Sequence, residues 1–101
     1  MSARIGVRNG AVYLSAETVA TYFPGIATVA ILIREGRLMV APVHHAGAGG
    51  CLLKIRNAAG DRVALAADVF QANGLGDFRA DDLAADWSAE SGALTASLIA
   101  N

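Results

Sequence analysis

Apolar and polar residues alternate at the start of the chain. Residues 3–8 and 11–14 show this alternation on either side of Asn9-Gly10. Asn-Gly is the strongest signal for a two-residue hairpin, because both central positions of a type I′ turn need positive φ. We therefore predict that the chain begins with a β-hairpin.

The next segment carries the signals of a short helix. Ser15 is a good N-cap, and Glu17 falls in the first turn, where the helix dipole favours a carboxylate. Val19, Tyr22 and Phe23 share one face before Pro24-Gly25 stops the helix. We expect about two turns of helix.

A second hairpin is expected around Glu35-Gly36. Residues 26–33 are nearly all β-branched or aliphatic, a pattern typical of a strand that is covered on both faces. Residues 37–43 form the returning strand, in which Pro42 predicts the end of the ladder. We expect this hairpin to lie at the centre of the sheet.

The second half of the chain predicts the same order of elements. A hairpin comes first, a short helix follows with Asp68 as its cap, and a hairpin comes last. Residues 77–86 are polar and fit either a strand or a solvated acidic loop. The expected segments are strands at 51–57 and 62–65, a helical stop at Asn73-Gly74, and strands at 85–88 and 93–99.

The matching order of signals indicates an internal duplication, with repeats at about 1–46 and 51–101. Residues 5–9 and 12–14 recur as residues 53–57 and 63–65. Two hairpin-helix-hairpin units predict a single α+β domain that is mainly antiparallel β, built as a small pseudo-twofold barrel or sandwich. We favour the barrel because closure leaves the fewest strand edges.

Composition and charge narrow the class of protein. The 101 residues are 54% hydrophobic and carry a formal net charge of −1. Residues 1–50 hold four Arg against two Glu, whereas residues 51–101 hold four basic against seven acidic side chains. Basic residues are not clustered, so nucleic-acid binding is disfavoured. The asymmetry leaves open an antiparallel self-association of basic half over acidic half.

Cysteine content and hydropathy bear on the compartment. Cys51 is the single cysteine, so no intrachain disulfide forms, which is typical of a reducing compartment. The start of the chain has no apolar signal region, and the longest apolar run, residues 26–33, is far shorter than a membrane span. We expect a cytoplasmic protein that does not enter a membrane.

The junction of the two repeats holds the candidate soft-metal ligands, His44, His45 and Cys51. Three ligands with an open fourth position would suit zinc. Adjacent histidines on an extended chain point to opposite sides, however, and Cys51 begins a strand with no helix N-terminus behind it to stabilise a thiolate. Two loop histidines beside a structural cysteine are therefore favoured.

Two other motifs are weaker. The glycines of residues 47–50 lack the lysine and the helix start of a phosphate loop, so loop flexibility or close backbone packing is favoured. The spacing of the acidic residues is not that of a calcium-binding loop. These are Asp77, Asp81, Asp82 and Asp86. We assign no catalytic residue and no cofactor.

The apolar hairpin at 26–43 carries the functional hypothesis. It offers more apolar surface than two short helices can cover. We expect a non-catalytic structural or protein-interaction subunit that forms a homo-oligomer or binds a protein partner through Leu32, Leu38, Met39 and Val40. The alternative is a small metal- or ligand-binding enzyme with its site at His44, His45 and Cys51.

Overall fold

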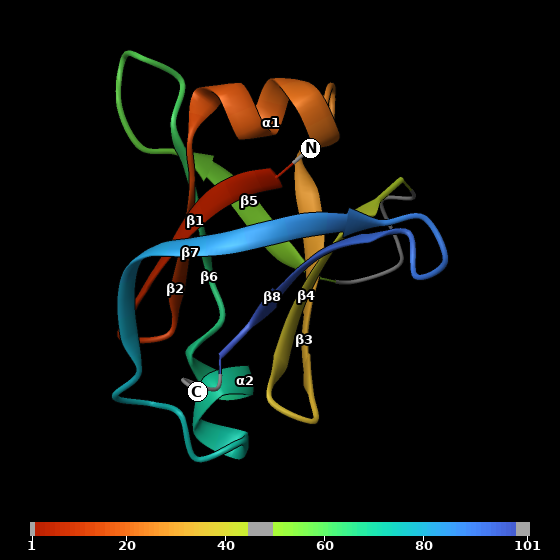
Figure 1. Cartoon of the computed structure of the whole chain (residues 1–101). Coiled ribbons are helices and arrows are strands. Elements are labelled where there is room, and N and C mark those ends of the chain that lie inside the picture. The colour runs from red at the N-terminus through yellow and green to blue at the C-terminus, as the bar shows by residue number, and fades with distance from the viewer. Residues whose placement is uncertain (1, 45–49, 99–101) are drawn as a thin grey trace.

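The structure, a computed structural model, describes residues 2–44 and 50–98. Over these residues the order is two strands, a helix and two strands, and then the same again (Figure 1). The elements are β1 (Ser2–Arg8), β2 (Ala11–Leu14), α1 (Ala16–Tyr22), β3 (Thr28–Arg34), β4 (Arg37–Val43), β5 (Cys51–Ile55), β6 (Arg62–Leu65), α2 (Ala67–Ala72), β7 (Arg79–Ser88) and β8 (Ala93–Ser97).

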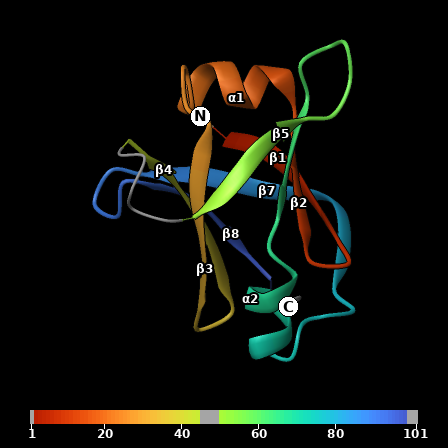
Figure 2. The same ribbon diagram turned by 180° about the vertical axis from the view of Figure 1, so that it is seen from behind.

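The eight strands close into one barrel. Their order is β1-β2-β6-β5-β3-β4-β8-β7, and β7 pairs with β1 to complete the ring. Every pairing is antiparallel. The barrel is therefore confirmed, and the alternative sandwich is not formed. The two helices lie at opposite ends of the barrel (Figures 1 and 2). Neither helix is long and apolar enough to cross a membrane.

The two short hairpin turns have the backbone that the sequence predicts. Asn9 and Gly10 have φ of 51° and 78°, and Glu35 and Gly36 have φ of 52° and 75°. Positive φ at both central positions is the signature of a type I′ turn, whose twist matches that of the flanking strands. These turns set the register of the β1–β2 and β3–β4 ladders.

The helix starts agree with the prediction in one half only. The Ser15 hydroxyl accepts a hydrogen bond from the Thr18 backbone N–H at 3.1 Å, which confirms the cap of α1. The prediction of Asp68 as the cap of α2 is wrong, because the helix begins directly after β6 and places Asp68 in its first turn. The cap position belongs to Ala66, which has no side-chain hydrogen bond to the helix.

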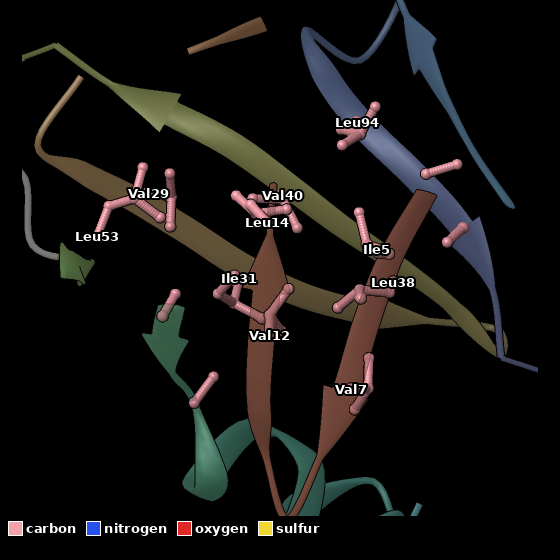
Figure 3. Close-up of a cluster of buried hydrophobic side chains, with 14 of the residues drawn as sticks. Ile5, Val7, Val12, Leu14, Val29, Ile31, Leu38, Val40, Leu53 and Leu94 are labelled. Atoms are coloured by element: carbon pink, nitrogen blue, oxygen red, sulfur yellow. The ribbon is translucent and has the colours of Figure 1, made fainter. Parts of the chain in front are cut away.

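Alternate strand positions fill the barrel with aliphatic side chains (Figure 3). The largest side chains without exposed surface include Phe23, which follows α1, and Phe70, which belongs to α2. Near α1 the Trp87 ring stacks on Tyr22, with centroids 5.7 Å apart, and meets the edge of Phe23 at 6.3 Å. Each end of the barrel is therefore closed by a helix and its aromatic residues.

A hairpin turn in each half of the chain accepts a hydrogen bond from the start of the helix in the other half. The Gly10 carbonyl in the β1–β2 turn accepts a hydrogen bond from the Ala66 N–H at 2.8 Å, directly before α2. A carboxylate oxygen of Asp61, in the β5–β6 turn, accepts one from the Ala16 N–H of α1 at 2.8 Å. These contacts cross between the halves, so neither half supplies both partners of either hydrogen bond.

Three sequence expectations at the strand level have different outcomes. The polar segment at 77–86 is the strand and not the alternative acidic loop, because most of it lies in β7, which pairs with both β1 and β8. The returning strand β4 ends at Val43 as expected, one residue after Pro42, which still pairs with Val29. The β3–β4 hairpin is not the centre of a sheet, because a closed barrel has no centre.

Gly10 tests the close approach of the first turn to α2. A Cβ on Gly10 would lie 2.5 Å from the Ala67 Cα, and its φ is 78°. Gly92 is a matched control, because it has φ of 64° but nothing within 4 Å of such a Cβ. We expect Gly92→Ala to cost about 1 to 2 kcal/mol through its backbone alone, and Gly10→Ala to cost about 1 to 3 kcal/mol more. Urea unfolding measures both, and equal losses would contradict the close packing.

Asp61 tests the contact between the second turn and α1. Hydrogen bonds from the Asn57 side chain and the Ala16 N–H lower the pKa of this carboxyl from its ordinary value. A lowered pKa stabilises the fold above the pKa of the unfolded chain, and this stabilisation is lost as pH falls through the folded pKa. We expect Asp61→Asn to lower the melting temperature at neutral pH and the difference to shrink below about pH 4. Asp77→Asn, at an exposed carboxylate, is the control. A deficit that persists undiminished in acid would contradict the role of the charge.

Candidate functional site

The β3–β4 hairpin presents one face to the barrel interior and the other to the outside. Successive side chains of a strand point to opposite faces. Val29, Ile31, Leu38 and Val40 are buried, at 5% exposure or less, and they pack in the core (Figure 3). The residues between them must therefore point outward.

The outward positions of this hairpin form an uncharged surface, here called the outer face. Its members are three cross-strand pairs, Thr28 with Val43, Ala30 with Ala41, and Leu32 with Met39. Leu32 is 50% exposed, and the other five are partly buried. Charge returns only at the next pair, Arg34 with Arg37, beside the turn.

A shallow groove of about 510 Å³ lies beside Leu32, over β4, β8 and β7. Its floor contains the partly buried Met39 and the buried Thr95, which are cross-strand partners. The Arg37 guanidinium donates to the Thr95 hydroxyl at 3.1 Å, and that hydroxyl donates to the Asp86 carbonyl at 3.2 Å. The remaining lining residues are Arg34, Glu35, Trp87, Ser88 and Ser91.

The two rims of this groove carry opposite charge. Arg34 and Arg37 lie on the β3–β4 side, with Glu35 in the turn between them, and Asp86 lies on β7. All four are exposed. None belongs to an ion pair among the described residues. These side chains are therefore available to charges on another molecule.

The opposite side of the barrel, over β1 and β7, is charged and internally paired. Arg4 lies 3.8 Å from Asp82, and Asp81 lies 3.5 Å from Arg8 and 3.7 Å from Arg79. All five side chains are at least half exposed. Pairs of this kind typically contribute about 0.2 to 1 kcal/mol each. Basic residues of the first half and acidic residues of the second half thus pair here within one chain, and their association between two chains stays a prediction.

Two of the four residues predicted for the interface lie on the outer face. Leu32 and Met39 point outward, whereas Leu38 and Val40 have no exposed surface and belong to the core. This chain covers the inner face of the hairpin but leaves Leu32 half exposed on the other face, so cover of the outer face by another subunit stays a prediction. An interface can therefore use Leu32 and Met39 but not Leu38 and Val40.

The structure describes two of the three candidate soft-metal ligands, His44 and Cys51. His44 is exposed, and Cys51 is partly buried against the core and pairs with Val29. Burial raises the pKa of the Cys51 thiol. No group of three His, Cys, Asp or Glu residues suited to a metal is found over residues 2–44 and 50–98. His45 lies outside the described residues.

The glycine segment at this junction is described at Gly50 only, and there it shows close backbone packing. Its φ is 111°, and a Cβ would lie 2.7 Å from the Val29 carbonyl oxygen. This agrees with the structural role favoured from the sequence. The rest of that glycine segment lies outside the described residues.

The sequence reasoning missed the groove, although its residues were visible. Arg37, Asp86 and Thr95 come from three strands, and only the β4–β8 and β7–β8 registers bring them together. The sequence predicts the last hairpin, with strands at 85–88 and 93–99, but its pairing with β4 has no local signal. Residues 77–86 were left open between a strand and a solvated acidic loop, because they have no clean alternation.

Comparison of the chain with family models, with curated proteins and with solved structures finds no significant match. The function is therefore argued from the residues and their placement alone.

The thiol of Cys51 provides a test of the junction. Because burial raises its pKa, little thiolate is present at neutral pH, and the thiolate is the reactive form. We expect a disulfide reagent to label the folded protein more slowly than the same protein in denaturant, where Cys51 is exposed. Labelling that is faster in the folded state would show an activated thiol and contradict a structural role.

Proposed function

We propose that this protein is a non-catalytic interaction subunit that binds a protein through the outer face of its β3–β4 hairpin. The carrying observation is the run of three uncharged cross-strand pairs on that face, with Leu32 half exposed beside Met39. The same side chains on a free surface would expose apolar area to water. Burial of one Leu against a partner contributes roughly 1.5 to 3 kcal/mol.

The division of the barrel surface supports this proposal. Charged side chains pair with one another over β1 and β7, which favours exposure of that side to water. The outer face has an apolar centre with charged groups at its edge, the arrangement typical of protein interfaces. Met39 adds a flexible side chain that adapts to the shape of a partner.

The alternative, a metal- or ligand-binding enzyme at His44, His45 and Cys51, receives no support from the described residues. His44 and Cys51 are placed without a third ligand among them, and the pKa of the thiol is raised, which is opposite to what a nucleophile needs. We keep a cytoplasmic setting as part of the proposal, on the single cysteine.

We also infer that the two halves derive from one duplicated unit related by a near-twofold rotation. Exchanging β1–β4 with β5–β8 in the strand order returns the same ring, written in the opposite direction. The reciprocal hydrogen bonds of Gly10 and Asp61 to the opposite helix starts support the same relation. Superposition of residues 4–43 on 53–98 in an experimental structure tests it, and a rotation far from a half-turn would contradict it.

Leu32→Glu tests the interaction surface. We expect the variant to keep the wild-type melting temperature, because the position is half exposed, and to lose the association that the wild type shows by light scattering at micromolar concentration. Leu65→Glu is the matched control, since Leu65 is 57% exposed but lies on β6. If the wild type is a monomer, the measurement is instead the capture of a partner protein, in stoichiometric amount, from extracts of the cells that produce the protein. Capture by the wild type is then compared with capture by the two variants.

Met39→Glu is a second variant on the same face. Loss of association with the fold retained in both variants supports the proposal. If Met39→Glu unfolds, Met39 belongs to the core, and the proposed function is then judged from Leu32→Glu alone. Identical association of wild type, Leu32→Glu and Leu65→Glu would overturn the proposed function.

A further inference from the structure

We propose that the groove between α1 and the β5–β6 turn binds a small monocarboxylate with an apolar chain, and that Arg62 holds the carboxylate. This site is separate from the outer face, and it goes beyond the proposed function because its occupant is a small molecule and not a protein. The observation that carries the proposal is a buried Nε–H of Arg62 that has no hydrogen-bond acceptor among the described residues.

Arg62 enters the end of the barrel that α1 closes. It begins β6 and pairs with Leu14 of β2 and with Ile55 of β5. Cross-strand partners lie on the same face of a sheet, and Leu14 is buried in the core, so Arg62 points inward between two aliphatic neighbours. An inward-pointing arginine needs acceptors for its N–H groups, because a buried donor without one is destabilising.

The protein satisfies only part of the Arg62 guanidinium. Its Nη1 donates to the Leu53 carbonyl oxygen at 3.2 Å, whereas Nε and Nη2 have no acceptor among the described residues. Arg62 also belongs to no ion pair among them. Nε and Nη2 lie along one edge of the planar guanidinium, and such a pair of donors matches the two oxygens of a carboxylate. The unpaired edge is therefore suited to one carboxylate group.

The groove beside Arg62 supplies the apolar part of the site. α1 and the β5–β6 turn lie at the same end of the barrel (Figures 1 and 2), and the groove between them has a volume of about 660 Å³. Small-molecule sites typically measure about 300 to 1,000 Å³. Apart from Arg62, every lining residue is apolar or glycine, including Val19 and Ala20 of α1 and the following Phe23 and Ile26. One positive charge in an apolar groove is complementary to one negative charge on an apolar chain.

The neighbouring charge selects against anions with more than one charge. Asp61 directly precedes Arg62, and hydrogen bonds from the Asn57 side chain and the Ala16 N–H lower the pKa of its carboxyl, so it is ionised at neutral pH. A dianionic phosphate would meet one guanidinium beside this carboxylate, whereas phosphate sites typically supply several donors from Arg clusters or helix N-termini. A monocarboxylate is balanced by Arg62 alone.

Binding requires a small movement of the guanidinium. Nε is covered by protein atoms, whereas Arg62 as a whole is partly exposed and lines the groove. We expect the guanidinium to turn toward the groove when a carboxylate binds. An unpaired donor is then replaced by a charge-assisted hydrogen bond, which is one of the stronger kinds in proteins.

The test is a titration of isotope-labelled protein with sodium octanoate, followed by NMR. We expect the Nε–H signal of Arg62 to shift and to saturate with one site per chain. Octanol keeps the chain without the charge, and acetate keeps the charge without the chain. We expect each to bind at least about tenfold more weakly than octanoate, because each lacks one of the two contacts.

Two substitutions separate the role of the charge from that of the groove. Arg62→Met keeps an unbranched side chain without the guanidinium, and we expect it to lower the octanoate affinity by about tenfold or more and to leave the octanol affinity unchanged. Ala20→Trp fills the groove from an exposed position of α1, so we expect it to abolish binding of both ligands. Thr21→Trp is the matched control, because Thr21 is exposed on the same helix but does not line the groove. Thermal melting verifies the fold of each variant.

The outcomes decide this proposal separately from the proposed function. Saturable octanoate binding that Arg62→Met and Ala20→Trp weaken and Thr21→Trp leaves intact supports it. Absence of saturable binding overturns it, as does equal binding of octanoate and octanol. Shifts confined to Leu32 and Met39 would place the ligand on the outer face and overturn it as well. If Arg62→Met unfolds, the comparison of octanoate with octanol and the Ala20→Trp variant decide. The proposed function is tested by Leu32→Glu and does not depend on these results.

Discussion

The hydrogen bonds that join each hairpin turn to the opposite helix are the constraint on which this fold depends. The Gly10 carbonyl holds the start of α2, and the Asp61 carboxylate holds the start of α1. The helices close the two ends of the barrel. These hydrogen bonds therefore attach the helix of one half to a strand hairpin of the other half. A single half would lose the hydrogen bond that the other half accepts from its helix start, and each of its strands would keep only its hairpin partner. We therefore expect the chain to fold as one unit.

Barrel closure has a direct consequence for the β3–β4 hairpin. A strand has two faces, and closure uses one of them for the core, where Ile31 and Val40 are buried. The helices cover the ends of the barrel and not its sides (Figures 1 and 2). The outward side chains Leu32 and Met39 therefore keep an apolar surface that the chain itself does not cover. The proposed interface follows from the fold, because closure of the barrel buries only the inner face of an apolar hairpin.

Signals from neighbouring residues in the sequence were sufficient to predict two hairpin turns and one helix start. Asn9-Gly10 and Glu35-Gly36 set the two turns, and Ser15 capped its helix. Long-range pairing was not accessible in the same way. The strand that contains Asp86 is stabilised by β1 and β8 and not by its own alternation, so only its last residues, 85–88, were predicted as a strand, and residues 77–86 were left open between a strand and a loop. Leu38 and Val40 were assigned to the interface because the apolar pattern alone does not say which face of a hairpin meets the core.

The central claim, that the outer face is a protein-interaction surface, is tested most directly by isotope-filtered NMR on labelled protein mixed with its unlabelled binding partner, or with unlabelled copies of the chain where the wild type self-associates. The account predicts intermolecular contacts to the methyl groups of Leu32 and Met39. Absence of intermolecular contacts, or contacts confined to exposed apolar residues elsewhere such as Ile55 and Leu65, would contradict it.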